Sequence, residues 1–296
     1  MPKLSMLPTI LAAFAFAAGP AQAEMKSQWV EYSHGDTKLK AYMAYDDKVS
    51  GKRPAVLVVH AREGMTPKTQ ALTELWAKLG YVSFAADIFG YGQGVLPKDV
   101  PEMQAQIAIY SDDRPLMRAR TQAGYNALLK NPMVDPAKVA LIGYCFGGGV
   151  GVEFGSTGAP LVANVSIHGS FRDHHAGWAR NAKGMYLILH GAEDQGFPLP
   201  VVDKVVQELR GAKVPFQLEV TAAPATASPR PRTRTRSAPT RSRSPRPDGH
   251  SRSSSASERG GHVARRSVRW IEAAALLHAH RWTSDLLRGA LVLRFP

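Results

Sequence analysis

The chain contains one cysteine, Cys145, and the residues around it are those expected around a catalytic nucleophile. The apolar run Val139–Ile142 is followed by Gly143, Tyr, Cys145, Phe, Gly147 and two further glycines. This order predicts a strand, a tight turn and a helix start, the arrangement that presents a nucleophile at the end of a strand. Gly143 and Gly147 fit it because a strained turn needs small neighbours. The alternative is a buried free cysteine beside a glycine-rich packing turn.

The same segment indicates how a reacting carbonyl group could be stabilised. The positive end of the helix that begins after Cys145 favours the thiolate form of the side chain. The backbone N–H of Phe146 is then predicted to point at the developing oxyanion. We expect a second N–H from the loop after His60, namely that of Arg62. Together these groups predict acyl transfer through a covalent thioester.

A candidate acid follows the predicted strand Met185–Leu189, in the segment His190-Gly-Ala-Glu-Asp194. Folds with this kind of turn carry the nucleophile, the acid and the histidine in that order along the chain. Asp194 is predicted to hold the imidazole in one tautomer and to stabilise the imidazolium. Glu193 is the nearest alternative acid, and a carboxylate that only caps the loop is the simpler explanation.

Three histidines, His60, His168 and His190, each follow a predicted strand. The carboxyl ends of parallel strands line the cleft in such sheets. We interpret these histidines as side chains that pack and form hydrogen bonds around the turn, and not as catalytic groups. His174 and His175 are adjacent, but no cysteine or acidic ligand spacing supports a metal site there. The sequence therefore predicts no metal and no cofactor.

Strands and helices alternate around these residues, after an antiparallel pair at Trp29–Ser33 and Leu39–Tyr45. The further predicted strands are Pro54–His60, Tyr81–Ala86, Val139–Ile142, Leu161–Ile167, Met185–Leu189 and Phe216–Val220. The predicted helices are Thr69–Leu79, Arg114–Lys130, Gly147–Phe154 and Leu199–Leu209. This alternation predicts an α/β fold: a doubly wound, mostly parallel sheet with helices on both faces.

The segment Gly143-Tyr-Cys-Phe-Gly-Gly148 resembles the turn of the dienelactone hydrolase family, which are α/β-hydrolases with a Cys-Asp-His triad. The resemblance extends from about Trp29 to Val220. It implies a carboxymethylenebutenolidase-type hydrolase that cleaves an ester, lactone or thioester of a small molecule. Many relatives place a glutamate, the partner of the resting thiol, where this chain has Ala61; here the glutamate is Glu63. A catalytically inactive relative that acts as a binding protein is the alternative.

The resemblance also implies arginines that hold the carboxylate of acidic lactones in some relatives. Arg114, Arg118 and Arg120 lie in the body of the chain, but the sequence does not show which way they face. The substrate and the oligomeric state are therefore left open.

The histidine of the implied triad is missing from its expected place. The resemblance places it in the loop after Phe216–Val220, at Thr226, and no histidine follows that strand before His250. Read one base earlier, the codons of residues 221–229 permit Tyr-Gly-Gly-Ala-Arg-His-Gly-Phe-Thr, which matches the family segment. Our hypothesis is a one-base frameshift near codon 220. The chain as it stands is then expected to be nearly inactive, unless another histidine serves as the base.

The positive charge of the chain is confined to its last quarter. Residues 1–220 hold 22 basic and 20 acidic side chains, whereas residues 221–296 hold 15 arginines and four acidic residues. Residues 221–296 are rich in Arg, Pro and Ser, and we expect a disordered tail. A nucleic-acid-binding arm is the alternative, but no aromatic residue interleaves the arginines. The body, residues 24–220, is expected to bind no nucleic acid.

The first 23 residues predict a secretory signal peptide. Lys3 supplies the positive start, Leu7–Ala18 is an apolar stretch too short to span a membrane, and Ala21-Gln-Ala23 is a small-residue cleavage site. The mature protein is expected to begin at Glu24, outside the cytoplasm, in a periplasm or beyond the cell. Residues 24–220 contain no apolar run of about 18 residues, so no contact with a membrane is expected.

Overall fold

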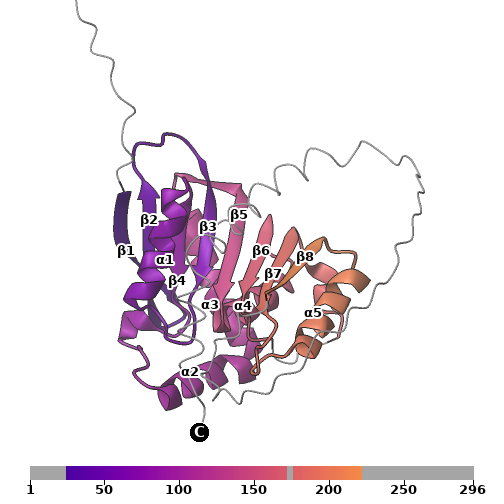
Figure 1. Ribbon diagram of the computed structural model, residues 1–296. Helices are drawn as coiled ribbons and strands as arrows, with labels where there is room; N and C mark the ends of the chain where they lie inside the picture. The colour runs from indigo at the N-terminus through magenta and orange to yellow at the C-terminus, as the bar shows by residue number, and fades with distance from the viewer. Residues whose placement is uncertain (1–24, 172–175, 222–296) are drawn as a thin grey trace, which may run out of the picture.

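Eight strands form one sheet in the computed structural model, which describes residues 25–171 and 176–221 (Figure 1). The strands are β1 (Met25–His34), β2 (Thr37–Asp46), β3 (Arg53–Val59), β4 (Val82–Ala86), β5 (Val134–Tyr144), β6 (Ala163–Ile167), β7 (Met185–Gly191) and β8 (Phe216–Thr221). Their order across the sheet is β1-β2-β4-β3-β5-β6-β7-β8. β1 and β2 are antiparallel to each other, and β2 is antiparallel to β4, whereas β4, β3, β5, β6, β7 and β8 are all parallel. The predicted doubly wound, mostly parallel sheet is confirmed.

Five α-helices and two short 3-10 helices connect the strands. They are α1 (Pro67–Lys78), α2 (Val100–Asp112), α3 (Arg114–Leu129), α4 (Phe146–Gly155) and α5 (Leu199–Gly211), with η1 (Tyr91–Gln93) and η2 (Trp178–Asn181). The sequence pattern does not predict α2, because only Tyr110 of this helix is buried and no apolar stripe marks it. Its start was readable, since the Asp99 side chain accepts a hydrogen bond from the N–H of Glu102 at 2.9 Å.

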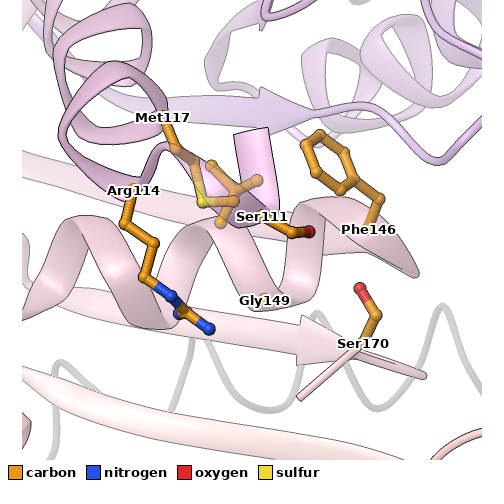
Figure 2. A pocket seen from close by; sticks show the side chains of 7 residues that line it. Ser111, Arg114, Met117, Phe146, Gly149 and Ser170 are labelled. Carbon is orange, nitrogen blue, oxygen red and sulfur yellow. The ribbon is translucent and has the colours of Figure 1, made fainter. Parts of the chain in front are cut away.

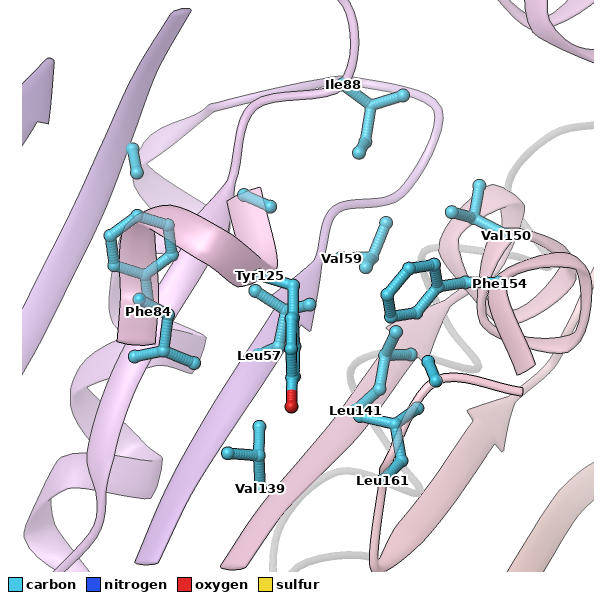
Figure 3. Packing of buried hydrophobic residues seen from close by; sticks show 14 of the residues in the cluster. Leu57, Val59, Phe84, Ile88, Tyr125, Val139, Leu141, Val150, Phe154 and Leu161 are labelled. Carbon is cyan, nitrogen blue, oxygen red and sulfur yellow. The ribbon is translucent and has the colours of Figure 1, made fainter. Parts of the chain in front are cut away.

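Helices cover both faces of the sheet, because alternate residues of each strand point to opposite sides. Leu57 and Val59 of β3 pack with α3 and α4, whereas Val56 and Val58 pack with α1. Figure 3 shows the first of these groups, in which the rings of Tyr125 from α3 and Phe154 from α4 meet side chains of the sheet. Each side chain buried in this way stabilises the fold by about 1.5–3 kcal/mol.

The parallel strands bring their carboxyl ends to one edge of the sheet. Cys145 follows β5, His168 follows β6, and the loop with Asp194 follows β7. Because β5, β6 and β7 are neighbours, these three residues lie beside one another.

Several sequence predictions concern residues outside the described ranges. They are the signal peptide at residues 1–23, the basic tail beyond residue 221, the position Thr226, and the pair His174 and His175. Within residues 25–171 and 176–221, no helix is both long enough and apolar enough to cross a membrane.

Candidate active site

Cys145 occupies a sharp turn between β5 and α4. Its backbone φ is 52° and its ψ is −114°, a conformation that a non-glycine residue adopts only when its surroundings impose it. Two hydrogen bonds hold the turn: the N–H of Cys145 donates to the carbonyl of Ile167 at 3.0 Å, and the N–H of Ser170 donates to the carbonyl of Cys145 at 2.9 Å. The side chain is partly exposed at the N-terminus of α4. The chain therefore presents the sulfur outward at the edge of the sheet.

The two glycines beside Cys145 allow the strand and the helix to approach closely. A methyl group on Gly143 would overlap the carbonyl oxygen of Gly147, and one on Gly147 would overlap the carbonyl oxygen of Val59 in β3. Both obstacles are backbone atoms and cannot rotate away. The need for small residues that the sequence indicated is therefore a packing requirement of the turn.

The two predicted oxyanion donors follow neighbouring strands, β5 and β3. Phe146 is the first residue of α4, so its N–H has no acceptor within the helix. Its ring is buried and stacks 6.1 Å from the ring of His60. Arg62 lies in the turn after β3, where the N–H of Gly64 donates to the carbonyl of Ala61 at 3.1 Å. The Arg62 side chain pairs with Glu63, with Nε 3.5 Å from Oε1.

Asp194 is the buried carboxylate of the loop after β7, with 6% of its side chain exposed. Its Oδ1 accepts hydrogen bonds from the N–H groups of Gly196 and Phe197, at 2.9 and 3.0 Å. Its Oδ2 lies 2.7 Å from Nδ1 of His168. Burial alone would raise the pKa of this carboxyl, but the hydrogen bond and the positive charge of His168 lower it below its usual value. Glu193, the alternative acid, is exposed.

His168, which the sequence indicated only as a histidine that packs and forms hydrogen bonds around the turn, lies beside both Cys145 and Asp194. Its side chain is 44% exposed, and its φ is 51°. Hydrogen bonding to Asp194, and secondly to Cys145, raises the pKa of His168 to about 10. The interpretation of this residue as a packing histidine therefore does not describe its surroundings. Its position after a strand was the available signal, but the sequence did not show that β6 lies between β5 and β7.

The other two strand-end histidines are buried and bond the backbone, His60 through both ring nitrogens and His190 through Nε2. Nδ1 of His60 lies 2.8 Å from the carbonyl of Ala61, and the N–H of Ile88 donates to its Nε2 at 3.2 Å. Nε2 of His190 lies 2.7 Å from the carbonyl of Phe197. Burial lowers the pKa of both histidines, so both are neutral at pH 7. These contacts agree with the expected packing role.

A cavity of about 10 Å³, room for one water molecule, lies beside the N-terminus of α4 (Figure 2). Its lining residues come from α2, α3, α4 and the loop after β6: Ser111, Arg114, Met117, Phe146, Gly149, Val150 and Ser170. Of the three candidate arginines, Arg114 is the one that lines it. Arg120 is buried elsewhere and donates to the Thr37 hydroxyl at 2.8 Å.

Arg114 and Arg118 share one buried carboxylate. Their Nη1 atoms lie 2.8 and 2.5 Å from the two oxygens of Glu153, whose side chain is 1% exposed. A buried carboxylate needs such partners, because an unpaired charge inside a protein costs several kcal/mol. The pair of arginines therefore also serves the packing of α3 against α4.

Comparisons with known proteins agree with this architecture. A family model described as the dienelactone hydrolase family matches residues 39–227. A carboxymethylenebutenolidase homolog of Mus musculus is 24% identical over 173 residues, which cover 58% of this chain and 68% of the relative. The crystal structure of a dienelactone-hydrolase-like promiscuous phosphotriesterase from metagenomic libraries is 34% identical, with a TM-score of 0.64 over 67% of this chain and 82% of that one. A second solved structure, m3DLH, is 30% identical, with a TM-score of 0.64 over 67% of this chain and 81% of that one.

Proposed function

We propose, because this chain belongs to the dienelactone hydrolase family, that Cys145 is the nucleophile with which it cleaves an ester, lactone or thioester bond of a small molecule. The chain is a hydrolase of the carboxymethylenebutenolidase-like kind. The observation that supports the cysteine as nucleophile is its strained turn between β5 and α4, with the carboxylate–imidazole pair of Asp194 and His168 beside it.

The proposed reaction begins when the sulfur of Cys145 attacks the carbonyl carbon. The N–H groups of Phe146 and Arg62 would bind the oxyanion, and N–H donors fixed in advance lower the barrier because they need no reorganisation. The leaving group departs with a proton from the imidazole that Asp194 holds. Water then hydrolyses the thioester and frees the sulfur.

The cavity beside α4 indicates where part of a substrate would lie. Phe146 follows Cys145 in the chain, and the N–H of Ser170 donates to the carbonyl of Cys145. Arg114 lines the same cavity as these two residues. The cavity itself has room for one water molecule, so we propose that the acyl portion of the substrate lies next to it, beside these residues. A carboxylate there would meet a guanidinium that Glu153 already neutralises in part.

The experiment compares the full-length chain with its Cys145→Ala variant on p-nitrophenyl acetate. Loss of one member of a catalytic triad typically reduces the rate by about 10³-fold or more, so we expect the variant to be nearly inactive. Ser33→Ala, on the exposed surface of β1, is the matched control and should keep the full rate. Equal hydrolysis by the Cys145→Ala variant would contradict the nucleophile. No hydrolysis by any chain would favour an inactive binding protein.

A nucleic-acid-binding arm in the tail makes a different prediction. It would give salt-sensitive binding of a DNA duplex, because bound arginines release counterions from the phosphates. Hydrolysis that needs Cys145, without such binding, supports the enzyme alone.

A further inference from the structure

We propose that His168 is the catalytic histidine of this chain, serving Cys145 and Asp194 in place of the histidine that is absent at Thr226. The inference rests on the proposed nucleophilic role of Cys145. It assigns the acid–base step to a residue inside the described body of the protein, so the chemistry does not depend on residues 222–296.

The main chain fixes the three residues relative to one another. The N–H of Cys145 donates to Ile167, the residue just before His168, at 3.0 Å. The N–H of His168 in turn donates to the carbonyl of Leu189 in β7 at 2.8 Å. The loop after β7 turns back through a hydrogen bond of 3.3 Å from the N–H of Asp194 to the carbonyl of Gly191. Three adjacent strands therefore set the spacing of the group, and regular elements hold such geometry more tightly than loops do.

The side chains have the orientation that the chemistry needs. Nδ1 of His168 lies 2.7 Å from Oδ2 of Asp194, so we infer that the other ring nitrogen, Nε2, serves the sulfur of Cys145. The other oxygen of Asp194 is held by the N–H groups of Gly196 and Phe197, so the carboxylate cannot easily turn away. An acid that fixes one ring nitrogen while the other serves the nucleophile is the defining feature of a triad.

Exposure separates His168 from the other described histidines near the site. His60 and His190 are 1% and 4% exposed; His60 bonds the backbone through both ring nitrogens. Nε2 of His190 lies 2.7 Å from the carbonyl of Phe197 and 3.4 Å from Oδ2 of Asp194, but its burial keeps it from a substrate. The His168 side chain is 44% exposed, so a substrate can reach it. His34, the remaining histidine of the described ranges, lies on β1, about 24 Å away across five strand spacings.

In this reaction His168 is the only side chain that gives up and takes back a proton. The thiolate of Cys145 bonds to the carbonyl carbon, and the C=O electron pair moves to the oxygen. When that pair returns, the bond to the leaving group breaks, and the leaving atom takes the proton from Nε2 of His168. Water then gives a proton to Nε2 and bonds to the thioester carbon. The C–S bond breaks, a thiolate leaves beside the restored imidazolium, and the carboxylic acid is released.

The test uses the full-length chain and its His168→Asn variant, because asparagine tolerates a positive φ. Two rates are measured: hydrolysis of p-nitrophenyl acetate, and alkylation of Cys145 by iodoacetamide from pH 5 to pH 9.5. An imidazolium beside the sulfur favours the thiolate. We therefore expect the wild-type chain to be alkylated about tenfold faster than the variant at pH 6, with the two rates converging at pH 9.5. Hydrolysis should fall by about 10³-fold.

Two controls separate the possible outcomes. His34→Asn makes the same substitution far from the site and should change neither rate. If Cys145→Ala abolishes hydrolysis while His168→Asn changes neither rate, the assignment of His168 is overturned and the nucleophile stands. If Cys145→Ala leaves hydrolysis intact, the proposed function itself fails. Alkylation of the wild-type chain no faster at pH 6 than that of a free cysteine would overturn the pairing even if the variant did not fold.

Discussion

His168 holds its proton more strongly than an ordinary histidine, because two acidic side chains contact the same ring. Hydrogen bonding to Asp194 and to Cys145 raises its pKa to about 10, and the His168 charge in turn lowers the pKa of Asp194. Such a pair stabilises the folded protein only while both members are ionised. The catalytic group should therefore leave a signature in the stability of the protein.

We predict that the His168–Asp194 pair stabilises the protein most between about pH 4 and pH 6.5. The folded pKa of His168 is raised above its usual value of 6.5, so this stabilisation is complete below pH 6.5 and is lost as the pH rises to about 10. The folded pKa of Asp194 is lowered, so its share is lost as the pH falls below 3.8. The measurement is the melting temperature of the wild-type chain minus that of His168→Asn, from pH 3 to pH 11. A difference independent of pH would contradict the pair.

The sequence identified two of the three residues in this group. Cys145 and Asp194 each belong to a short segment whose residue types reveal a turn after a strand, so local physics was enough to find them. His168 also follows a strand, but its role depends on which strands are neighbours and on a φ of 51°. Neither property is local. The resemblance to the family instead implied a histidine beyond β8, where the chain has Thr226.

The close packing of the turn between β5 and α4 limits which substitutions the chain tolerates there. The helix approaches β3 so closely that Gly147 has no room for a side chain. By contrast, nothing lies within 4 Å of the corresponding position on Gly211, at the end of α5. The two positions form a matched pair for substitution, since a side chain would overlap the backbone of β3 at Gly147 and would meet nothing at Gly211.

We predict that Gly147→Ala destabilises the protein by about 1–3 kcal/mol, because the added methyl group meets the backbone of β3. This corresponds to a melting temperature lower by about 3–9 °C for a domain of this size. Gly211→Ala should leave it unchanged or raise it slightly, since alanine favours helices. Thermal unfolding followed by circular dichroism measures both. Equal effects of the two substitutions would show that the close approach at Gly147 does not exist.

The elements themselves were largely readable from the sequence. Continuous apolar runs such as Pro54–His60 indicated buried strands, and β3 is observed at Arg53–Val59. The sequence did not predict α2, because the exposed surface of this helix gives no periodic signal. The order of the strands follows from their packing and twist, so it could be read only from the structure.

The body of the chain and its two ends support different predictions. Residues 25–171 and 176–221 contain the sheet and the candidate site, and residues 39–227 match the family. We propose that residues 1–23 direct export and that the mature protein works outside the cytoplasm. The excess of arginine belongs to residues 221–296 and does not describe the surface of the body.

We predict that material exported from a bacterial host begins at Glu24, because signal peptidase reads the small residues Ala21 and Ala23. N-terminal sequencing of the periplasmic fraction is the measurement. A chain that starts with Met followed directly by Glu24 is the control and should stay in the cytoplasm. Met1 retained on the exported protein would contradict the prediction.

The cluster of Arg114, Arg118 and Glu153 affects which molecules can lie beside the nucleophile. Two guanidinium groups share one carboxylate that is covalently part of the chain, so this carboxylate is always present and cannot be diluted away. An acidic ligand that binds beside Arg114 would have to compete with this carboxylate. Uncharged acyl groups face no such competition. We therefore expect the internal carboxylate to act as a permanently bound competitor, which favours neutral over anionic substrates beside the nucleophile.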